Sequence, residues 1–374
     1  MQRSVLALTC AIGVIGANSL VLSPISGTVA KGLAAAGPAD VLIASAAYGV
    51  ATALSALALA PLSDRLGADR VLTWALAAVC LGLIGSAVTP NLTGLSLAQG
   101  LAGMGAGAAL PAIYGLAAVV APPGRAAQTM GTVLTGWTLS LVAGVSLSAV
   151  VAEVVGWRGV FAILGGLAAL LLAWTTTTQF TDVPRGHRTS PLSALRVQGI
   201  GRALLSAGLT MLAFYGVYNY TGPHIVSELG APTWIAGMLA LTYGGGFGAA
   251  VLLDSQIDRI GARRAAPAVF AVLMTIYGAI ALTAGQLWVL LAVGFGWGII
   301  NHLSLNLIVG RLTALDPAQR GAILGLYSAV TYAAVTIGTL GFRPAYDAAG
   351  LAACAWIAVV LVAAMVTEAA TRKA

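Results

Sequence analysis

Long apolar runs with almost no charge are the feature that most restricts how this chain can fold. A bilayer hydrocarbon core is about 30 Å thick, so a helix that rises about 1.5 Å per residue needs about 20 apolar residues to cross it. When the sequence is divided at its charges and its proline and glycine clusters, twelve such runs appear. We therefore predict an all-α membrane protein with twelve transmembrane helices, at residues 4–30, 40–61, 71–89, 93–119, 129–152, 158–178, 203–228, 234–253, 266–284, 287–312, 321–343 and 350–369.

Composition supports this class and excludes others. Only 8% of the 374 residues are charged, against about 25% in an average soluble domain. The first run is longer than the apolar region of about 7–15 residues in a signal peptide, so we expect it to remain as a membrane helix. Cys10, Cys80 and Cys354 fall in separate apolar runs. This spacing does not indicate a disulfide framework or a metal cluster, and we expect no metal and no cofactor.

The positions of lysine and arginine predict the orientation in the membrane. If the N-terminus is cytoplasmic, only Lys31, Arg158 and Arg343 of the 18 basic residues fall outside, which leaves 18 − 3 = 15 inside. We therefore predict a multi-pass protein of the inner (cytoplasmic) membrane with both termini in the cytoplasm. The net charge of +7 is explained by this topology, so no nucleic-acid partner is expected.

A polar interval and an internal repeat divide the chain into two halves. The interval at 179–202 predicts a cytoplasmic linker between an N-terminal half, 1–178, and a C-terminal half, 203–374. The stretch LSDRLGADR, which ends at Arg70, aligns with QIDRIGARR, which ends at Arg264. Tyr48-Gly49 and Tyr243-Gly244 repeat at nearly the same offset. Two six-helix halves with parallel repeats are typical of one large class of secondary transporter.

The repeated loop also carries a family resemblance. With PLSDRLGADR as its signature loop between helices two and three, the chain resembles the major facilitator superfamily over nearly its whole length. The segments SPISGTVAKGL, LAQGLAGMGAGAALPA, MGTVLTGWTLSLVAG and GWRGVF are similar to the bacterial branch of drug, sugar and metabolite efflux permeases. The resemblance implies two pseudo-symmetric halves that transport a small molecule by alternating access, and a monomer.

The resemblance further implies a gating role for the loop and its repeat. The glycines permit a tight reversal between antiparallel helices, and an Asp–Arg pair at the rim can lock one side shut. The alternative is that these charges only set the topology. The predicted gating residues are Asp64, Arg65, Gly67, Arg70, Asp258, Arg259, Gly261 and Arg264.

His302 is the one ionisable side chain that the sequence places near the middle of a span. An intramembrane ionisable group is a functional candidate because burying it is costly. His302 is thus a candidate for proton coupling or for substrate contact, with Asn301 beside it and Asn306 one turn away. The alternative is a neutral imidazole that bonds to a neighbouring helix. Every Asp and Glu falls at a predicted helix end or in a loop, with Asp254 near the inner surface.

The family places its substrate cavity between the central helices of the two halves. In those spans the polar residues are aromatic hydroxyls, an indole and amides, which suit a neutral or weakly charged amphipathic solute. Packing or an interfacial position is the alternative for each Tyr and Trp. The candidate substrate-binding residues are Asn18, Tyr48, Trp137, Thr138, Tyr215, Tyr218, Asn219, Tyr243, Asn301, His302, Asn306 and Tyr332.

The leading interpretation is a secondary active transporter that exports its solute, with proton coupling as an open possibility. Two departures from the proton antiporters of the family weaken the inference of proton antiport. Ser96 occupies a position where these antiporters usually have an Arg, and Gly144-Val145-Ser146 replaces their Gly-Pro signal. A facilitator or importer of a neutral metabolite is the alternative, and a non-transporting receptor is a further one. No motif for an enzyme is present, so we expect none.

Overall fold

The computed structural model describes residues 2–122, 125–178, 180, 191–316 and 319–371. This part of the chain is helical and contains no strand. Eleven of its helices are long and apolar enough to cross a membrane, and a pair of helices bent by 41° forms a twelfth span. The predicted all-α membrane fold with twelve spans is confirmed.

The first six spans are assembled from straight and broken helices. The third, fourth and sixth are single helices, whereas the others are interrupted. Their bounds are α1 (Gln2–Leu20) with α2 (Leu22–Gly32); α3 (Pro38–Val41) with α4 (Ile43–Ala58) and α5 (Ala60–Leu66); α6 (Ala68–Val88); α7 (Leu92–Val119); α8 (Ala126–Leu139) with the π-helical turn η1 (Ser140–Val145) and α9 (Ser146–Val154); and α10 (Trp157–Thr177).

The last six spans follow the short 3₁₀ helix η2 (Pro191–Arg196). In the last of them, Ala349 and Gly350 are not helical, so its membrane part begins near residue 350 as predicted. The bounds are α11 (Ile200–Pro223) with the π-helical turn η3 (His224–Glu228); α12 (Thr233–Ala249) with α13 (Val251–Ile260); α14 (Ala262–Thr283); α15 (Leu287–Leu315); α16 (Arg320–Gly341); and α17 (Arg343–Thr371).

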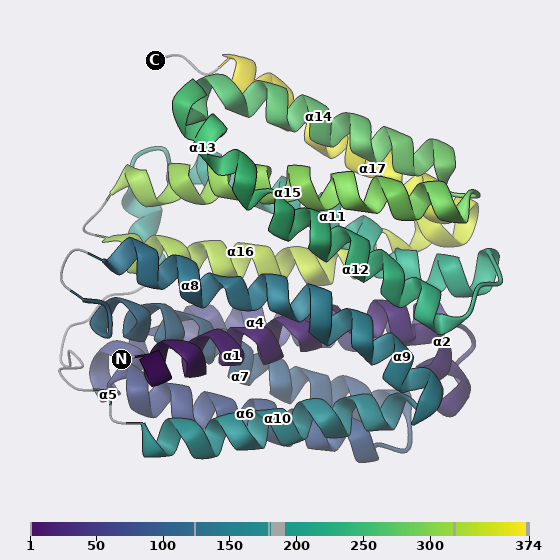
Figure 1. Ribbon diagram of the computed structural model, residues 1–374, viewed down its shortest axis with the longest axis horizontal. Helices are drawn as coiled ribbons and strands as arrows, with labels where there is room; N and C mark the ends of the chain where they lie inside the picture. Colours follow the sequence, from purple (N-terminus) through teal and green to yellow (C-terminus); the bar gives the residue numbers. More distant parts are fainter. Residues whose placement is uncertain (1, 123–124, 179, 181–190, 317–318, 372–374) are drawn as a thin grey trace.

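The helices lie side by side along the long axis of the molecule (Figure 1). The first six spans form the lower bundle in this view and the last six form the upper bundle, with both termini toward the left end. We call this the terminal end and the opposite one the far end. Of the predicted linker at 179–202, residues 179 and 181–190 lie outside the described part of the chain.

The two bundles repeat each other in detail. The turn between α5 and α6 is made by Gly67, with φ of +93°, and the turn between α13 and α14 by Gly261, with φ of +86°. A positive φ costs a side chain energy that glycine avoids, which explains why both copies of the repeat keep this residue. The sequence repeat is therefore a repeat of structure.

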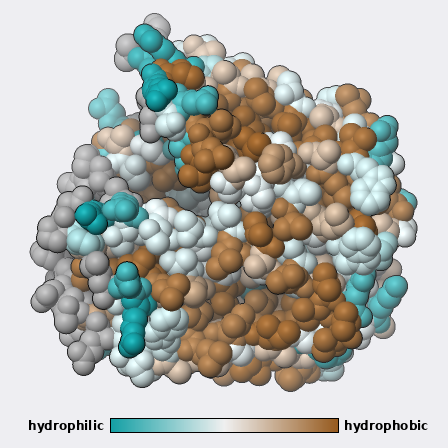
Figure 2. Space-filling view, in the orientation of Figure 1, coloured by the Kyte–Doolittle hydropathy of each residue, from teal (hydrophilic) through white to brown (hydrophobic). Residues whose placement is uncertain are grey.

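The outer surface is apolar between two polar ends. Figure 2 shows large hydrophobic areas across the middle of the molecule and hydrophilic groups toward its left and right ends. Leu252, Val154 and Leu282 are among the exposed side chains, at 80%, 78% and 74%. Apolar groups exposed on this scale require lipid as their surroundings.

Candidate functional site

The two halves touch each other at the far end. Across that contact, Arg343 at the start of α17 pairs with Asp40 of α3 at 3.0 Å. The Ser23 hydroxyl of α2 donates to the carbonyl of Tyr218 at 2.9 Å, and the amide of Trp234 donates to Glu153 at 3.0 Å. These contacts join α2, α3 and α9 of the N-terminal half to α11, α12 and α17 of the C-terminal half, and they close the far end.

At the terminal end the surface is hollowed. Figure 2 shows a recess at the left, below the projecting polar residues of the upper bundle. The helix ends on its two sides belong to different halves, with α13 above and α8 below (Figure 1). The molecule is therefore shut at the far end and open at the terminal end.

Tyrosines line the contact between the halves at mid-length. Tyr48 of α4 meets Tyr332 of α16 edge to face, with ring centroids 6.0 Å apart. The Tyr332 hydroxyl is buried and has no hydrogen-bond partner among the described residues. A buried hydroxyl without a partner is a donor and acceptor available to a ligand.

An aromatic cluster joins α11, α12 and α15 within the C-terminal half. Phe214 of α11 stacks on Tyr218 and Tyr243 at 5.1 and 5.4 Å, and Tyr243 meets Trp297 of α15 at 5.1 Å. Asn301 donates to the Tyr243 hydroxyl at 2.9 Å, whereas the Tyr218 hydroxyl has no hydrogen-bond partner in the part of the chain that the structure describes. Tyr218, Tyr243 and Asn301, three of the predicted substrate-binding residues, therefore lie in one cluster that contains both aromatic rings and polar groups.

Other predicted residues are occupied by partners within the protein. Asn18 of α1 and Gln99 of α7 exchange two amide hydrogen bonds, at 3.0 and 3.2 Å, and Gln99 also donates to Ser86 of α6. Asn219 donates to Thr339 of α16 at 2.6 Å. These buried amides hold helices together in this conformation, and substrate contact by either stays a prediction.

Trp137 and Thr138 lie near the end of α8, just before η1. A Cβ atom on Gly16 of α1 would lie 2.9 Å from the Trp137 ring, and one on Gly248 of α12 would lie 3.0 Å from Thr138. Both side chains are partly exposed. Trp137 therefore lies where α8 packs on α1, and Thr138 lies where α8 approaches α12 of the opposite half.

His302, Asn306 and Asp254 form a polar cluster between α15 and α13. Both Asp254 carboxylate oxygens lie 3.2 Å from His302 Nε2, and Asn306 Nδ2 lies 2.8 Å from Asp254 Oδ1. Phe247 of α12 packs edge to face against the imidazole at 4.9 Å. The sequence placed Asp254 near a helix end, but the bend after α12 continues as helix α13 and carries the carboxylate to His302. The missed signal was that the apolar run before Asp254 continues into the helical repeat QIDRI without a break, so that the carboxylate lies within a helix.

The predicted gating loops lie at the terminal end, where α5 meets α6 and α13 meets α14 (Figure 1). The arginines Arg65, Arg70, Arg259 and Arg264 are exposed there. The side chains of Asp64 and Asp258 lie outside the described part of the structure. Their gating role stays a prediction.

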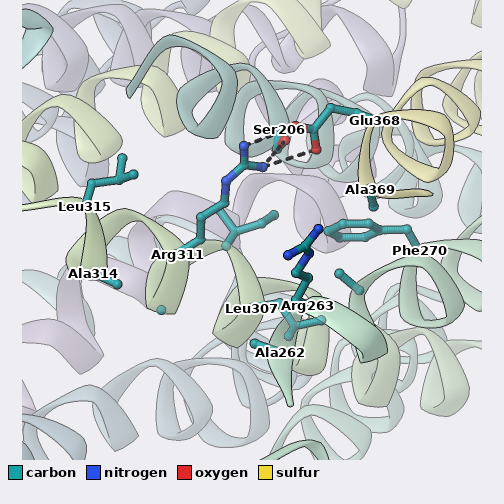
Figure 3. Close-up of a pocket in the computed structure, with 13 residues that line it drawn as sticks. Ser206, Ala262, Arg263, Phe270, Leu307, Arg311, Ala314, Leu315, Glu368 and Ala369 are labelled. Atoms are coloured by element: carbon teal, nitrogen blue, oxygen red, sulfur yellow. Dashed lines mark hydrogen bonds and ion pairs between the residues drawn. The ribbon is translucent and has the colours of Figure 1, made fainter. Parts of the chain in front are cut away.

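A cavity of about 330 Å³ lies within the C-terminal half, between α11, α14, α15 and α17 (Figure 3). On one side, Arg311 binds Glu368 through two parallel hydrogen bonds of 3.1 Å. Arg202 reaches the same carboxylate at 3.3 Å. This ion-pair group joins α11, α15 and α17 and contains no predicted site residue. Elsewhere among the described residues, no group of three His, Cys, Asp or Glu side chains is arranged to hold a metal ion.

The fold and sequence match known proteins. The family model of the Major Facilitator Superfamily matches residues 7–339. The chain belongs to this superfamily. It is a multi-pass membrane protein and a secondary transporter, as that family membership indicates.

Relatives and solved structures agree with this assignment. The MFS-type transporter YwfA of Bacillus subtilis (strain 168) is 28% identical over 93% of this chain and 86% of its own length. The inner membrane transport protein YdhP of Escherichia coli (strain K12) is 28% identical over 63% of this chain and 61% of its own. A D-xylose-proton symporter has the same fold, with a TM-score of 0.78, 16% identity, and coverage of 99% of this chain and 97% of the symporter. The human organic anion transporter MFSD10 is similar at a TM-score of 0.75, 17% identity, and coverage of 98% and 99%.

Proposed function

We propose that this major facilitator protein exports a small amphipathic solute across the inner membrane by alternating access, in exchange for protons. The observation that carries the proposal is the pair of helical bundles that close at the far end and part at the terminal end, with polar aromatic side chains between them. A site reached from one side at a time is what alternating access requires.

The positions of the basic residues indicate which end of the molecule faces the cytoplasm. The sequence assigns 15 of the 18 basic residues to one side of the membrane, and those of them that the structure describes include Arg65, Arg70, Arg259 and Arg264 at the terminal end, which the positive-inside rule assigns to the cytoplasm. With this orientation, the open end faces the cytoplasm, which is the side from which an exporter takes up its solute. Both termini are cytoplasmic in this proposal.

The lining suggests the chemistry of the solute. Tyr218 and Tyr332 offer buried hydroxyls without partners, and Asn301 offers an unpartnered Oδ1. Aromatic faces and neutral polar groups suit a solute with apolar rings or chains and a few hydrogen-bonding groups. Such a solute is neutral or carries a single weak charge.

Proton exchange is supported by the polar cluster at His302. A histidine titrates near neutral pH, so it can respond to a physiological proton gradient. One solved structure of this fold is named as a proton symporter. The absence of the usual Arg at Ser96 and of the Gly-Pro signal at Gly144 supports the alternative, which is a facilitator or importer of a neutral metabolite.

The test begins with thermal unfolding of the purified protein in the presence of drugs, sugars, amino acids and organic acids. A ligand at 100 times its Kd adds about 2.7 kcal/mol of stability, which shifts the unfolding midpoint visibly. The stabilising compound is then offered to proteoliposomes under a pH gradient of either sign. Export by exchange predicts accumulation only in vesicles that are acidic inside.

Two outcomes would decide against this function. Equilibration of the compound without regard to the gradient indicates a facilitator, and accumulation with the opposite gradient indicates an importer. As a matched pair of variants, Tyr218→Phe should weaken binding of the compound about tenfold, because it removes one hydrogen bond of about 1.4 kcal/mol. Tyr277→Phe, which removes a similarly buried hydroxyl from α14, should leave binding unchanged.

A further inference from the structure

We propose that the cavity of Figure 3 binds an amphipathic anion, whose anionic group lies beside Arg263 and Arg311 and whose apolar part lies on Phe270. The cavity has a volume of about 330 Å³, and all of its lining residues belong to the C-terminal half. Such an anion comes either from a phospholipid of the leaflet at the terminal end or from a soluble organic anion. The inference does not depend on the proposed export.

The cavity opens at the terminal end, where α14 begins and α15 ends. Ala262 and Arg263 of α14 and Gly310 of α15 are exposed there, whereas Phe270 and Leu307 of the same two helices are buried. At about 1.5 Å per helical residue, Phe270 lies about 10 Å further along α14 than Arg263. The lining therefore changes from basic at the mouth to apolar in the interior, in the same direction in which a bilayer changes from its surface to its middle.

Basic side chains exceed acidic ones at this cavity among the described residues. Arg311 binds Glu368 through two hydrogen bonds of 3.1 Å, and Arg202 reaches the same carboxylate at 3.3 Å. One carboxylate is thus shared by two guanidinium groups, which leaves an excess of positive charge before Arg263 is counted. Figure 3 shows the Arg263 side chain extending from α14 into the space beside this ion-pair group. Guanidinium groups bind carboxylates and phosphates through paired hydrogen bonds, so this wall of the cavity favours an anion.

The start of α14 adds to the positive potential. Arg263 lies in the first turn of this 22-residue helix, and that turn contains no acidic residue. No side chain caps the helix at Gly261. The first amides of a helix carry a partial positive charge, which favours a negative group close to them. Basic pockets between transmembrane helices are also the kind of site that holds anionic lipid headgroups.

The interior of the cavity requires an apolar part in the ligand. Phe270, Leu307 and Ile308 are buried and line the cavity together with the short side chains of Ala266 and Ala369. An inorganic anion would occupy the basic mouth and leave these apolar surfaces uncovered. A short chain or a ring attached to the anionic group would bury them, which contributes to binding in proportion to the apolar area removed from water.

The experiment is thermal unfolding of the purified full-length protein in dodecyl maltoside micelles with four additions, each compared with the protein alone. Dioleoylphosphatidylglycerol tests an anionic lipid, and dioleoylphosphatidylcholine is its zwitterionic control. Hexyl phosphate tests a soluble amphipathic anion, and inorganic phosphate is its control without an apolar part. A ligand that binds the folded state raises the unfolding midpoint, and the dose dependence of the midpoint gives the apparent affinity. Stabilisation by phosphatidylglycerol identifies a lipid site, and stabilisation by hexyl phosphate alone identifies a site for a soluble anion.

Two pairs of variants test the cavity itself. Arg263→Gln should weaken binding of the stabilising compound about tenfold, because a charge-assisted hydrogen bond is lost. Arg264→Gln removes the same charge from an exposed neighbour outside the cavity lining and should leave the affinity unchanged. Ala266→Leu keeps every charge and fills the apolar interior, so it should weaken binding by a similar factor. Ala268→Leu, at an exposed position of the same helix outside the lining, is its control.

Three results would overturn the proposal. One is a wild type that neither phosphatidylglycerol nor hexyl phosphate stabilises. Another is equal stabilisation of the wild type, Arg263→Gln and Ala266→Leu, which would show that the compound binds elsewhere. The third is inorganic phosphate that stabilises as strongly as hexyl phosphate, because the apolar interior would then have no part in binding. Folding is checked by gel filtration, and Ala266→Leu tests the site if Arg263→Gln does not fold.

Discussion

At the scale of single residues, the partly buried charges of Arg311 and Glu368 are held as a pair. Arg311 and Glu368 are only 15% and 19% exposed, and each satisfies the other through two hydrogen bonds. A charge taken from water needs such a partner, because an unpaired buried charge is strongly destabilising. The pair therefore fixes α15 against α17 next to the cavity of Figure 3.

Glu368→Gln should lower the free energy of unfolding by about 1–3 kcal/mol, because Arg311 keeps its charge and loses its counterion. Unfolding in mixed detergent micelles, followed by tryptophan fluorescence, measures the change. The control is Arg202→Gln, since Arg202 is 61% exposed, and we expect a loss below about 1 kcal/mol there. Equal losses in the two variants would show that the partial burial of the Arg311 pair adds no stability.

At the scale of elements, glycines let paired helices approach at the backbone in both halves. A Cβ on Gly103 of α7 would collide with the carbonyl of Tyr48 on α4, and one on Gly298 of α15 would collide with the carbonyl of Tyr243 on α12. The two contacts are copies of each other in the repeat. Small residues allow such packing in membranes, where lipid gives little hydrophobic force between helices.

Gly298→Ala should separate α12 from α15 and destabilise the protein by about 1–3 kcal/mol, because the methyl group meets backbone that cannot move aside. Thermal unfolding in detergent and the yield of folded protein both report this loss. Gly278→Ala on α14 is the matched control, since no atom lies within 4 Å of its Cβ position. If Gly298→Ala were as stable as Gly278→Ala, α12 and α15 would be able to move apart without a loss of stability.

At the scale of the whole molecule, a partly exposed ion pair is one of the contacts that join the halves at the far end. The Asp40–Arg343 pair is about one third exposed on both sides, so it contributes at most about 1 kcal/mol. Alternating access needs such weak contacts, because they must break when the far end opens. An ion pair of this strength changes the relative populations of the forms with a closed and an open far end, but it is too weak to hold the protein in one of them.

Asp40→Asn should therefore raise the population with an open far end by about two- to fivefold. Spin labels at Val155→Cys and Leu282→Cys, in a background without the native cysteines, lie on different halves and report the separation as a distance distribution. Asp347→Asn is the matched control, because Asp347 pairs with Arg343 within α17 and crosses no interface. If both variants gave the wild-type distribution, Asp40 would have no part in closing the far end.

The sequence by itself determined the class, the number of spans and the repeat. Those features depend on the length of the apolar runs and on the repeated turn with its glycine, which are local properties of the chain. It also identified His302, because an ionisable residue within an apolar run is conspicuous.

Only the tertiary structure decided which side chains meet. Asp254 and His302 are joined by the bend between α12 and α13, and Asn18 is joined to Gln99 by the crossing of α1 and α7. Helix crossings and bends depend on packing between segments far apart in the chain, so no local pattern reveals them. The same reason explains why the Asp40–Arg343 ion pair was not predicted, since the two residues lie on different halves of the molecule.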